Sequence, residues 1–160
     1  IWSLWGMDPN NFDVGVWGLK YPSWKEPDSP FKHGTWDGAL CDGFEPQENE
    51  PVFKKHRNSS FYNTAFNEYL TQDDCEYLVI IGSSTANCVP TTARDGFDRG
   101  YKVIVVADAG TAIPVHAPSR NGETPEGYGQ YWESLRNIQA QYADVMSSDE
   151  FAALVERSSR

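Results

Sequence analysis

The chain has few cysteines, and they form none of the patterns that bind metals or cross-link small folds. Its 160 residues contain 3 cysteines, at Cys41, Cys75 and Cys88, with no CxxC pair among them. A disulfide scaffold is therefore excluded, and no cysteine lies beside a histidine at the spacing of metal ligands. A reducing compartment, the cytoplasm, is the predicted location.

Long apolar runs and an excess of positive charge are also missing. No stretch approaches the roughly 18 uninterrupted apolar residues that a membrane span requires. Lys and Arg number 13 against 23 Asp and Glu, which gives a formal net charge of −10. Such a surface repels a nucleic-acid backbone and an anionic bilayer, so neither is predicted as a partner.

The first fifty residues are rich in tryptophan and poor in patterns of regular structure. Five of the six tryptophans lie here, and Pro and Gly recur every few positions. Excursions of this length inside a domain are usually functional or disordered, and the aromatic content argues against disorder. The sequence predicts an ordered flap of turns packed by Trp and Phe.

After residue 50 the chain alternates between apolar strands and amphipathic helices. The runs YLVIIG (77–82) and KVIVVAD (102–108) are continuously apolar, which is typical of parallel strands buried on both faces. Further strands are predicted at 1–5, 51–55 and 143–147, and helices at 60–74, 89–99, 125–141 and after a Ser148 cap. The pattern predicts one domain over 1–160, an α/β three-layer sandwich with a mostly parallel, doubly wound sheet.

Cys88 lies where an open parallel sheet binds its ligands. The segment IGSSTANC leaves the strand at 77–82 and delivers Cys88 to the start of a helix, with Pro90 in the first turn. The positive end of the helix dipole and its unbonded N–H groups stabilise a thiolate at this position. A nucleophilic thiol is one interpretation, and a small buried cysteine is the other.

The string around Cys88 resembles the signature of the isochorismatase-like cysteine hydrolases. That signature runs roughly G-x-x-T-x-x-C-V-x-x-T-A-x-D-A-x-D-R-G-Y, followed by a strand and D-A. The matching string here is GSSTANCVPTTARDGFDRGYKVIVVADA, from Gly82 to Ala109. A second block, KHRNSSF, is similar to the family's K-x-R-x-S-A-F and places the family lysine on Lys55.

The resemblance implies a hydrolase of a small non-peptide amide or carbamoyl compound that works through a thioester. In the family the cysteine attacks the carbonyl, which assigns that role to Cys88, and the lysine supports the thiolate, which assigns that role to Lys55. The oxyanion hole implied here uses the N–H groups of Cys88 and Ser84, with a cis peptide bond between Ser83 and Ser84.

Lys55 also has an ordinary interpretation, as a solvent-exposed lysine at a strand end. Adjacent residues on a strand face opposite ways, so only one of Lys54 and Lys55 points inward, and the register favours Lys55. Trp36 and Phe61 are expected in the substrate pocket, with core packing as the alternative for both. No cofactor is expected, the partner is a small-molecule substrate, and the family resemblance implies a homo-oligomer.

The family aspartate that handles the proton is not found. IWSLW is similar to the family's second strand, so the first strand and helix are expected to precede Ile1 and to be absent from this chain. Asp8, in the string MDPNNFD, is the alternative base. The metal-binding nicotinamidase branch carries a D-x-H…H cluster in the region where this chain has only His33, so no zinc or iron site is expected.

Two further functions are alternatives to amide hydrolysis. Vinyl-ether hydrolysis of the isochorismate type belongs to a branch that typically lacks a cysteine at this position, so Cys88 speaks against it. A non-catalytic role, as a truncated or diverged member of the family, is supported by the aspartate that is not found.

Overall fold

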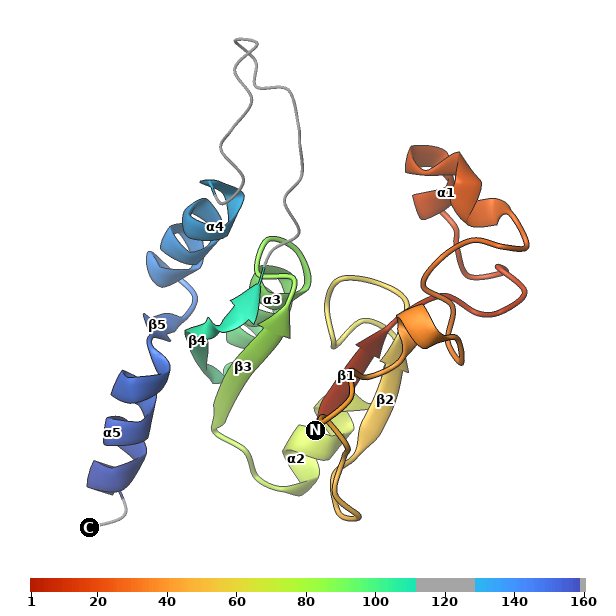
Figure 1. Ribbon diagram of the computed structural model, residues 1–160. Helices are drawn as coiled ribbons and strands as arrows, with labels where there is room; N and C mark the ends of the chain where they lie inside the picture. Colours follow the sequence, from red (N-terminus) through yellow and green to blue (C-terminus); the bar gives the residue numbers. More distant parts are fainter. Residues whose placement is uncertain (112–128, 159–160) are drawn as a thin grey trace, which may run out of the picture. The chain divides into compact units, whose positions relative to one another are not determined.

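The computed structural model describes residues 1–111 and 129–158 (Figure 1). The beginning of the helix predicted at 125–141 lies outside the described residues. The chain divides into two compact units, residues 1–69 and 70–160, called here the first and the second unit. The elements, in chain order, are β1 (Trp2–Trp5), α1 (Trp17–Lys20), η1 (Pro22–Lys25), η2 (Trp36–Gly38), β2 (Val52–Lys55), α2 (Phe66–Gln72), β3 (Tyr77–Ser83), α3 (Cys88–Asp98), β4 (Lys102–Thr111), α4 (Gly129–Gln139), β5 (Asp144–Met146) and α5 (Ser148–Ser158).

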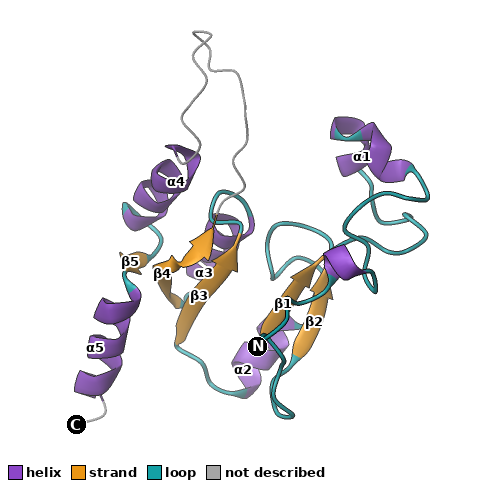
Figure 2. Ribbon diagram, in the orientation of Figure 1, coloured by secondary structure: helices purple, strands orange, loops and turns teal. Residues whose placement is uncertain are grey.

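The first unit is built on a pair of parallel strands. β1 pairs with β2 in a register that sets Trp2 opposite Val52 and Trp5 opposite Lys55. Between the strands the chain forms turns and short helices, and Figure 2 shows how much of it is loop. The carboxyl end of β2 therefore lies beside the carboxyl end of β1, where Trp5 and Lys55 are neighbours across the ladder.

Aromatic packing orders the long excursion between β1 and β2, as the sequence predicts. The Trp24 ring lies 5.6 Å from the rings of Trp5 and Trp17, 6.1 Å from Phe31 and 4.6 Å from Tyr21, between ring centroids. These are stacked, tilted and edge-to-face contacts, the arrangements that aromatic pairs prefer. The flap is thus held by its own side chains instead of by a ladder of backbone hydrogen bonds.

The helix predicted at 60–74 is shorter in the structure, because α2 begins only at Phe66. Local side-chain hydrogen bonds occupy the preceding backbone: Ser59 Oγ accepts from the Phe61 N–H at 3.1 Å, and Thr64 Oγ1 accepts from the Phe66 N–H at 3.2 Å. Ser and Thr compete with a helix for backbone groups in this way. The apolar spacing that suggests a longer helix is therefore outweighed by turn-forming residues.

The second unit contains a three-stranded parallel sheet in the order β3-β4-β5. β4 is central, and Val103, Ile104, Val105 and Val106 are all buried, which confirms the prediction for that run. The same prediction is wrong for β3, where the exposed Val79 and Ile81 alternate with more buried neighbours. Successive side chains of a strand point to opposite faces, so Tyr77, Val79 and Ile81 share one face of β3, and that face is exposed in the second unit.

α3 follows β3 and ends as the sequence predicts. Gly100 adopts a φ of +94°, a left-handed conformation, and the Tyr101 N–H donates to the Gly96 carbonyl at 3.1 Å while the Gly100 N–H donates to Phe97 at 2.9 Å. This is the way a glycine satisfies the last carbonyl groups of a helix. A salt bridge of 2.8 Å between Arg99 and Asp95 adds to the same turn.

The last helix is capped by Ser147, so the prediction of Ser148 as the cap is wrong by one residue. Ser147 Oγ accepts from the Glu150 N–H at 3.2 Å, and Glu150 Oε2 accepts from the Ser147 N–H at 2.8 Å, which is a capping box. Ser148 instead donates its N–H and Oγ–H to the Asp108 carboxylate, at 2.8 and 2.7 Å. These two hydrogen bonds hold the pKa of Asp108 below its usual value and tie β4 to α5.

Every strand pair in the described residues is parallel, which confirms the α/β class with parallel sheets. None of the helices within 1–111 and 129–158 is long and apolar enough to cross a membrane. The prediction of one domain over 1–160 stays a prediction.

Candidate active site

The loop from Gly82 to Cys88 leaves the carboxyl end of β3 through an unusual backbone. Gly82 has a φ of +112°, and the peptide bond between Ser83 and Ser84 is cis, at the bond that the family resemblance implies. The Ser84 carbonyl then accepts from the N–H groups of Asn87 at 3.0 Å and Val89 at 3.2 Å. The loop is therefore closed on itself as it enters α3.

β4 supports this loop from the side. The Thr85 N–H donates to the Thr111 carbonyl at 2.8 Å, and Thr85 is only 2% exposed. Gly110 lies so close that a Cβ placed on it would be 2.7 Å from Thr85 Oγ1 and 2.9 Å from the Gly82 carbonyl oxygen. The end of β4 thus needs a residue without a side chain for the loop to take this course.

Cys88 is the first residue of α3 and is partly exposed. Ser83 is the last residue of β3 and Ser84 begins the loop, so the second unit holds three of the predicted site residues on one short segment, at the carboxyl end of a parallel strand. The N-terminus of a helix is the positive end of its dipole and favours negative charge. This arrangement suits a thiolate nucleophile and the oxyanion that its attack creates.

Cys88 is expected to react with iodoacetamide faster than Cys41 and Cys75. Access alone gives the opposite order, because Cys41 is exposed while Cys88 and Cys75 are only partly exposed. Thiolate character makes a cysteine reactive, and only Cys88 begins a helix. Peptide mass mapping after brief alkylation of the folded protein measures the order, and labelling led by Cys41 would contradict the expectation.

Lys55 ends β2 in the first unit and is only 3% exposed, whereas Lys54 beside it is exposed. The inward direction of Lys55 is therefore confirmed, and its interpretation as a solvent-exposed lysine is wrong. Its Nζ donates to the carbonyl groups of Arg57 at 2.5 Å and Asn58 at 2.7 Å. A buried ammonium needs such acceptors, because desolvation of a charge is otherwise costly.

Around Lys55 the structure adds polar residues that the sequence analysis did not select for the site. His56 Nδ1 lies against Asp13 Oδ2, and the Arg57 guanidinium donates to the Asp13 carbonyl at 3.1 Å. His33 is only 6% exposed, and its ring packs edge-on against the ring of His56, with 5.6 Å between the two ring centroids. Burial, followed by the charges of Lys54 and His56, lowers the pKa of His33. The spacing of Asp13, His33 and His56 along the chain carries no signal of this cluster.

The two predicted pocket aromatics have different environments. Trp36 begins η2 and is 93% exposed, so it has almost no packing partners in the first unit. Phe61 is 6% exposed and its ring lies 4.8 Å from that of Phe66. Phe61 therefore packs within its own unit, and the assignment of Phe61 and Trp36 to a substrate pocket stays a prediction.

Asp8, the alternative base, lies in a turn of the first unit. Its Oδ1 accepts from the Asn10 N–H at 2.8 Å, and its own N–H donates to both carboxylate oxygens of Asp13, at 2.9 and 3.1 Å. Short-range hydrogen bonds of this type stabilise Asx turns. The Asp8 carboxylate thus stabilises the turn that carries Asp13.

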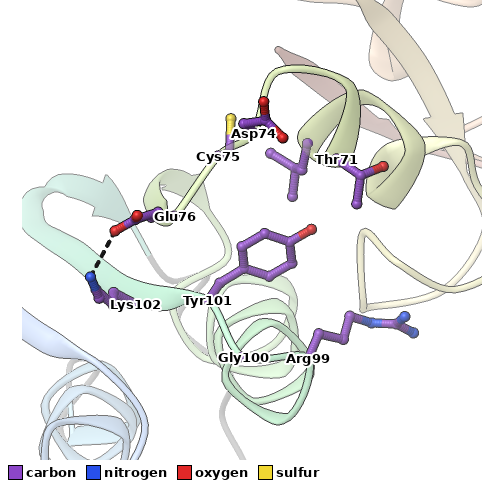
Figure 3. A pocket seen from close by; sticks show the side chains of 9 residues that line it. Thr71, Asp74, Cys75, Glu76, Arg99, Gly100, Tyr101 and Lys102 are labelled. Carbon is purple, nitrogen blue, oxygen red and sulfur yellow. Dashed lines mark hydrogen bonds and ion pairs between the residues drawn. The ribbon is translucent and has the colours of Figure 1, made fainter.

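A cavity of about 710 Å³ lies at the opposite end of the second unit's strands (Figure 3). It is lined by the last turn of α2, the connection from α2 to β3, the connection from α3 to β4 and the first residue of β4. The Tyr101 side chain is among these residues, and Lys102 and Glu76 form an ion pair of 2.8 Å. Cys88 follows the carboxyl end of β3, whereas this cavity lies at the amino ends. The cavity is therefore not the predicted site.

In the part of the chain that the structure describes, no group of His, Cys, Asp and Glu residues is arranged to hold a metal ion.

Comparison with known proteins gives a consistent set of similarities. The family model of the Isochorismatase domain matches residues 19–150. The ureidoacrylate amidohydrolase RutB of Yersinia enterocolitica is 32% identical over 89% of this chain and 69% of that protein. RutB of Methylorubrum extorquens is 34% identical over 68% of this chain and 48% of that protein, so the chain spans about half the length of that relative.

Solved structures share the fold. A cysteine hydrolase from Pseudomonas syringae pv. phaseolicola superposes with a TM-score of 0.85 at 24% identity, over 97% of this chain and 70% of that chain. N-carbamoylsarcosine amidase from Thermoplasma acidophilum gives a TM-score of 0.66 at 24% identity, over 92% of this chain and 70% of that chain. At this level of identity the likeness establishes the fold.

Proposed function

This chain belongs to the isochorismatase family, and we propose that the protein is a cysteine-dependent hydrolase of a small non-peptide amide or carbamoyl compound. The observation that carries the proposal is the position of Cys88, the first residue of α3 directly after the loop from a parallel strand. A nucleophile is well placed there, since the positive end of the helix dipole favours the developing negative charge.

The proposed reaction proceeds in two steps. The Cys88 thiolate attacks the carbonyl carbon, the N–H groups of Cys88 and Ser84 stabilise the oxyanion, and the C–N bond breaks as the leaving amine accepts a proton. Water then attacks the thioester and gives up a proton, which releases the acid and regenerates the thiolate. In the proposal Lys55 supplies the positive charge that supports the anionic groups, a role that its burial and inward direction suit.

The proposed substrate class follows from the relatives with more than 30% identity. RutB of Yersinia enterocolitica is named for the hydrolysis of ureidoacrylate, a ureido compound. A compound of this class offers the carbonyl carbon flanked by nitrogen that the proposed thiolate attacks. The family implies a homo-oligomer, and the cysteine content a cytoplasmic location; both belong to the same proposal.

The test is a panel of ureidoacrylate, simple primary amides, N-carbamoyl amino acids and isochorismate. Ammonia release from a ureido compound or amide, with an acyl adduct trapped on the Cys88 peptide and detected by mass spectrometry, is the expected result. Pyruvate release from isochorismate without an adduct would favour vinyl-ether hydrolysis instead. A protein that alkylates at Cys88 yet turns over no member of the panel would favour the non-catalytic alternative.

Turnover is expected to survive removal of divalent metals. The proposed attack needs a thiolate and N–H donors, and within residues 1–111 and 129–158 no metal-binding group is present. Assays after dialysis against EDTA, with and without added zinc, measure this, and the rate is expected to stay within about twofold. Loss of activity with EDTA and its recovery with zinc would contradict the proposed mechanism.

A further inference from the structure

The segment that contains α1 carries apolar side chains on its outer side. Phe12 is 80% exposed, Val16 is 68% exposed and Leu19 is 77% exposed. The Leu19 N–H donates to the Val16 carbonyl at 3.1 Å, so the two side chains lie on one face of the same helical turn. These three residues are called here the outer patch. They belong to a part of the first unit that lies apart from the β1–β2 pair (Figure 1).

The other side of the same segment packs into the first unit. Val14 is only 2% exposed, and a Cβ placed on Gly18 would be 2.3 Å from Cε of Lys25. The Trp17 ring joins the aromatic cluster, with 5.6 Å between its centroid and that of Trp24. The direction of α1 is therefore fixed by its inner residues, and the outer patch faces solvent.

Polar contacts hold the backbone on both sides of the outer patch. Asn11 Nδ2 donates to the carbonyl groups of Lys25 at 3.2 Å and Glu26 at 2.7 Å. The buried Lys32 donates from Nζ to the Pro9 carbonyl at 3.1 Å. A surface that is already ordered loses less conformational entropy when it binds a partner. The outer patch is therefore suited to a specific contact.

The area of the outer patch fits an interface between two proteins. Its three side chains expose roughly 300 Å² of apolar surface, from the areas of whole Phe, Val and Leu side chains. A standard interface buries about 800 Å² on each partner, of which about 60% is apolar. The outer patch alone thus supplies more than half of the apolar area that such an interface needs.

The charges beside the outer patch suit a second copy of the chain. The whole chain has a formal net charge of −10, so most faces of two copies repel each other. Between residues 14 and 28 the charged side chains are exposed and sum to zero: Lys20, Lys25, Glu26 and Asp28. In a two-fold contact one face meets itself, so the lysines of one copy can pair with the carboxylates of the other.

We propose that the outer patch is the centre of a two-fold interface between two copies of this chain, with the two lysines and two carboxylates at its rim. An apolar centre with a charged rim is the usual composition of a protein interface. The inference rests on the homo-oligomer of the proposed function and assigns its contact surface. It requires no hydrolytic activity, so it is tested separately from the reaction.

Sedimentation velocity of the chain between about 1 and about 200 μM is expected to show a reversible equilibrium of monomer and dimer. Leu19→Glu is expected to raise the dissociation constant about hundredfold, because the two-fold axis brings two new carboxylates into the apolar centre. Val155→Glu is the matched control. Val155 is 48% exposed on α5 in the second unit, and its replacement adds the same charge, with an expected change of less than about threefold.

Two results would overturn the proposal. A chain that stays monomeric over this range has neither the interface nor the homo-oligomer of the proposed function. A dimer that Leu19→Glu leaves unchanged keeps the homo-oligomer and rejects the outer patch as its interface. If Leu19→Glu does not fold, as judged by near-ultraviolet circular dichroism of the aromatic cluster, Leu19→Ala decides: its dissociation constant is expected to rise about tenfold, and no rise contradicts the proposal.

An exchange of charges tests whether this face meets itself. Lys20→Glu makes the rim acidic and Asp28→Lys makes it basic, so each variant alone is expected to dimerise about tenfold more weakly at low ionic strength. An equal mixture of the two variants sets an acidic rim against a basic one, and is expected to recover most of the affinity. A mixture that associates no more tightly than the separate variants would overturn the two-fold contact.

Discussion

Cys88→Ala and Lys55→Ala are each expected to abolish hydrolysis, with a loss of roughly 10³-fold or more, and the double variant is expected to be no worse. In the proposed mechanism the thiolate forms the bond, and the ammonium supports the charges that its attack creates. Groups that act as one unit lose most of their effect when any member is removed, so their effects do not add. Steady-state rates of ammonia release from ureidoacrylate for the three variants measure this.

Lys54→Ala is the control for these variants. Lys54 is adjacent to Lys55 on β2 but exposed, so its loss removes the same charge without touching the buried position. Activity within about threefold of the unmodified protein is expected, as for most exposed substitutions. If Lys54→Ala were the damaging change and Lys55→Ala kept most of the activity, the assignment of the lysine would be off by one residue.

Gly110→Ala is expected to destabilise the second unit by about 1–3 kcal/mol and to lower activity strongly. A methyl group there would be 2.7 Å from Thr85 Oγ1 and 2.9 Å from the Gly82 carbonyl oxygen, so the loop that leads to Cys88 has to move. Thr85 is buried and bonded to Thr111, which leaves it little room to yield. Urea unfolding and the alkylation rate of Cys88 give the two readouts.

Gly129→Ala provides the matched comparison. Gly129 begins α4, and a Cβ built on it meets nothing within 4 Å. Alanine also has the higher helix propensity, so this variant is expected to be neutral or slightly stabilising. Equal stability of the Gly110→Ala and Gly129→Ala variants would show that the close contact at Gly110 does not constrain the loop.

The sequence predicts well what depends on short-range pattern. The alternation of side chains along a strand separates Lys54 from Lys55, and the glycine after α3 ends that helix as predicted. In contrast, the runs at β3 and β4 read alike, and only the pairing order makes β4 central and β3 an edge. Strand order depends on contacts between distant segments, which a local apolar pattern does not encode.

In the candidate site, too, the features that neighbouring residues determine are predicted from the sequence, whereas contacts between distant segments are not. Cys88 is marked by its motif and by the strand-to-helix transition that surrounds it, and both are local. The ring of His33 lies beside that of His56, although more than twenty residues of mostly irregular chain separate the two, and their spacing in the sequence gives no sign of the contact. Trp36 and Phe61 are predicted as pocket aromatics, but a residue type does not reveal whether a ring is exposed, as that of Trp36 is, or packed on Phe66, as that of Phe61 is.

The unequal distribution of indole rings gives the protein a spectroscopic signal for its first unit. Trp2, Trp5, Trp17, Trp24 and Trp36 all lie in residues 1–69, and Trp132 is the one tryptophan beyond them. The rings of Trp5, Trp17 and Trp24 lie within 5.6–6.4 Å of one another, close enough for their electronic transitions to couple. The near-ultraviolet circular dichroism signal during unfolding therefore reports the packing of the aromatic residues in the first unit. Tryptophan fluorescence reports the same unit once Trp132 is replaced by Phe, because Trp132→Phe removes the second unit's contribution to the emission.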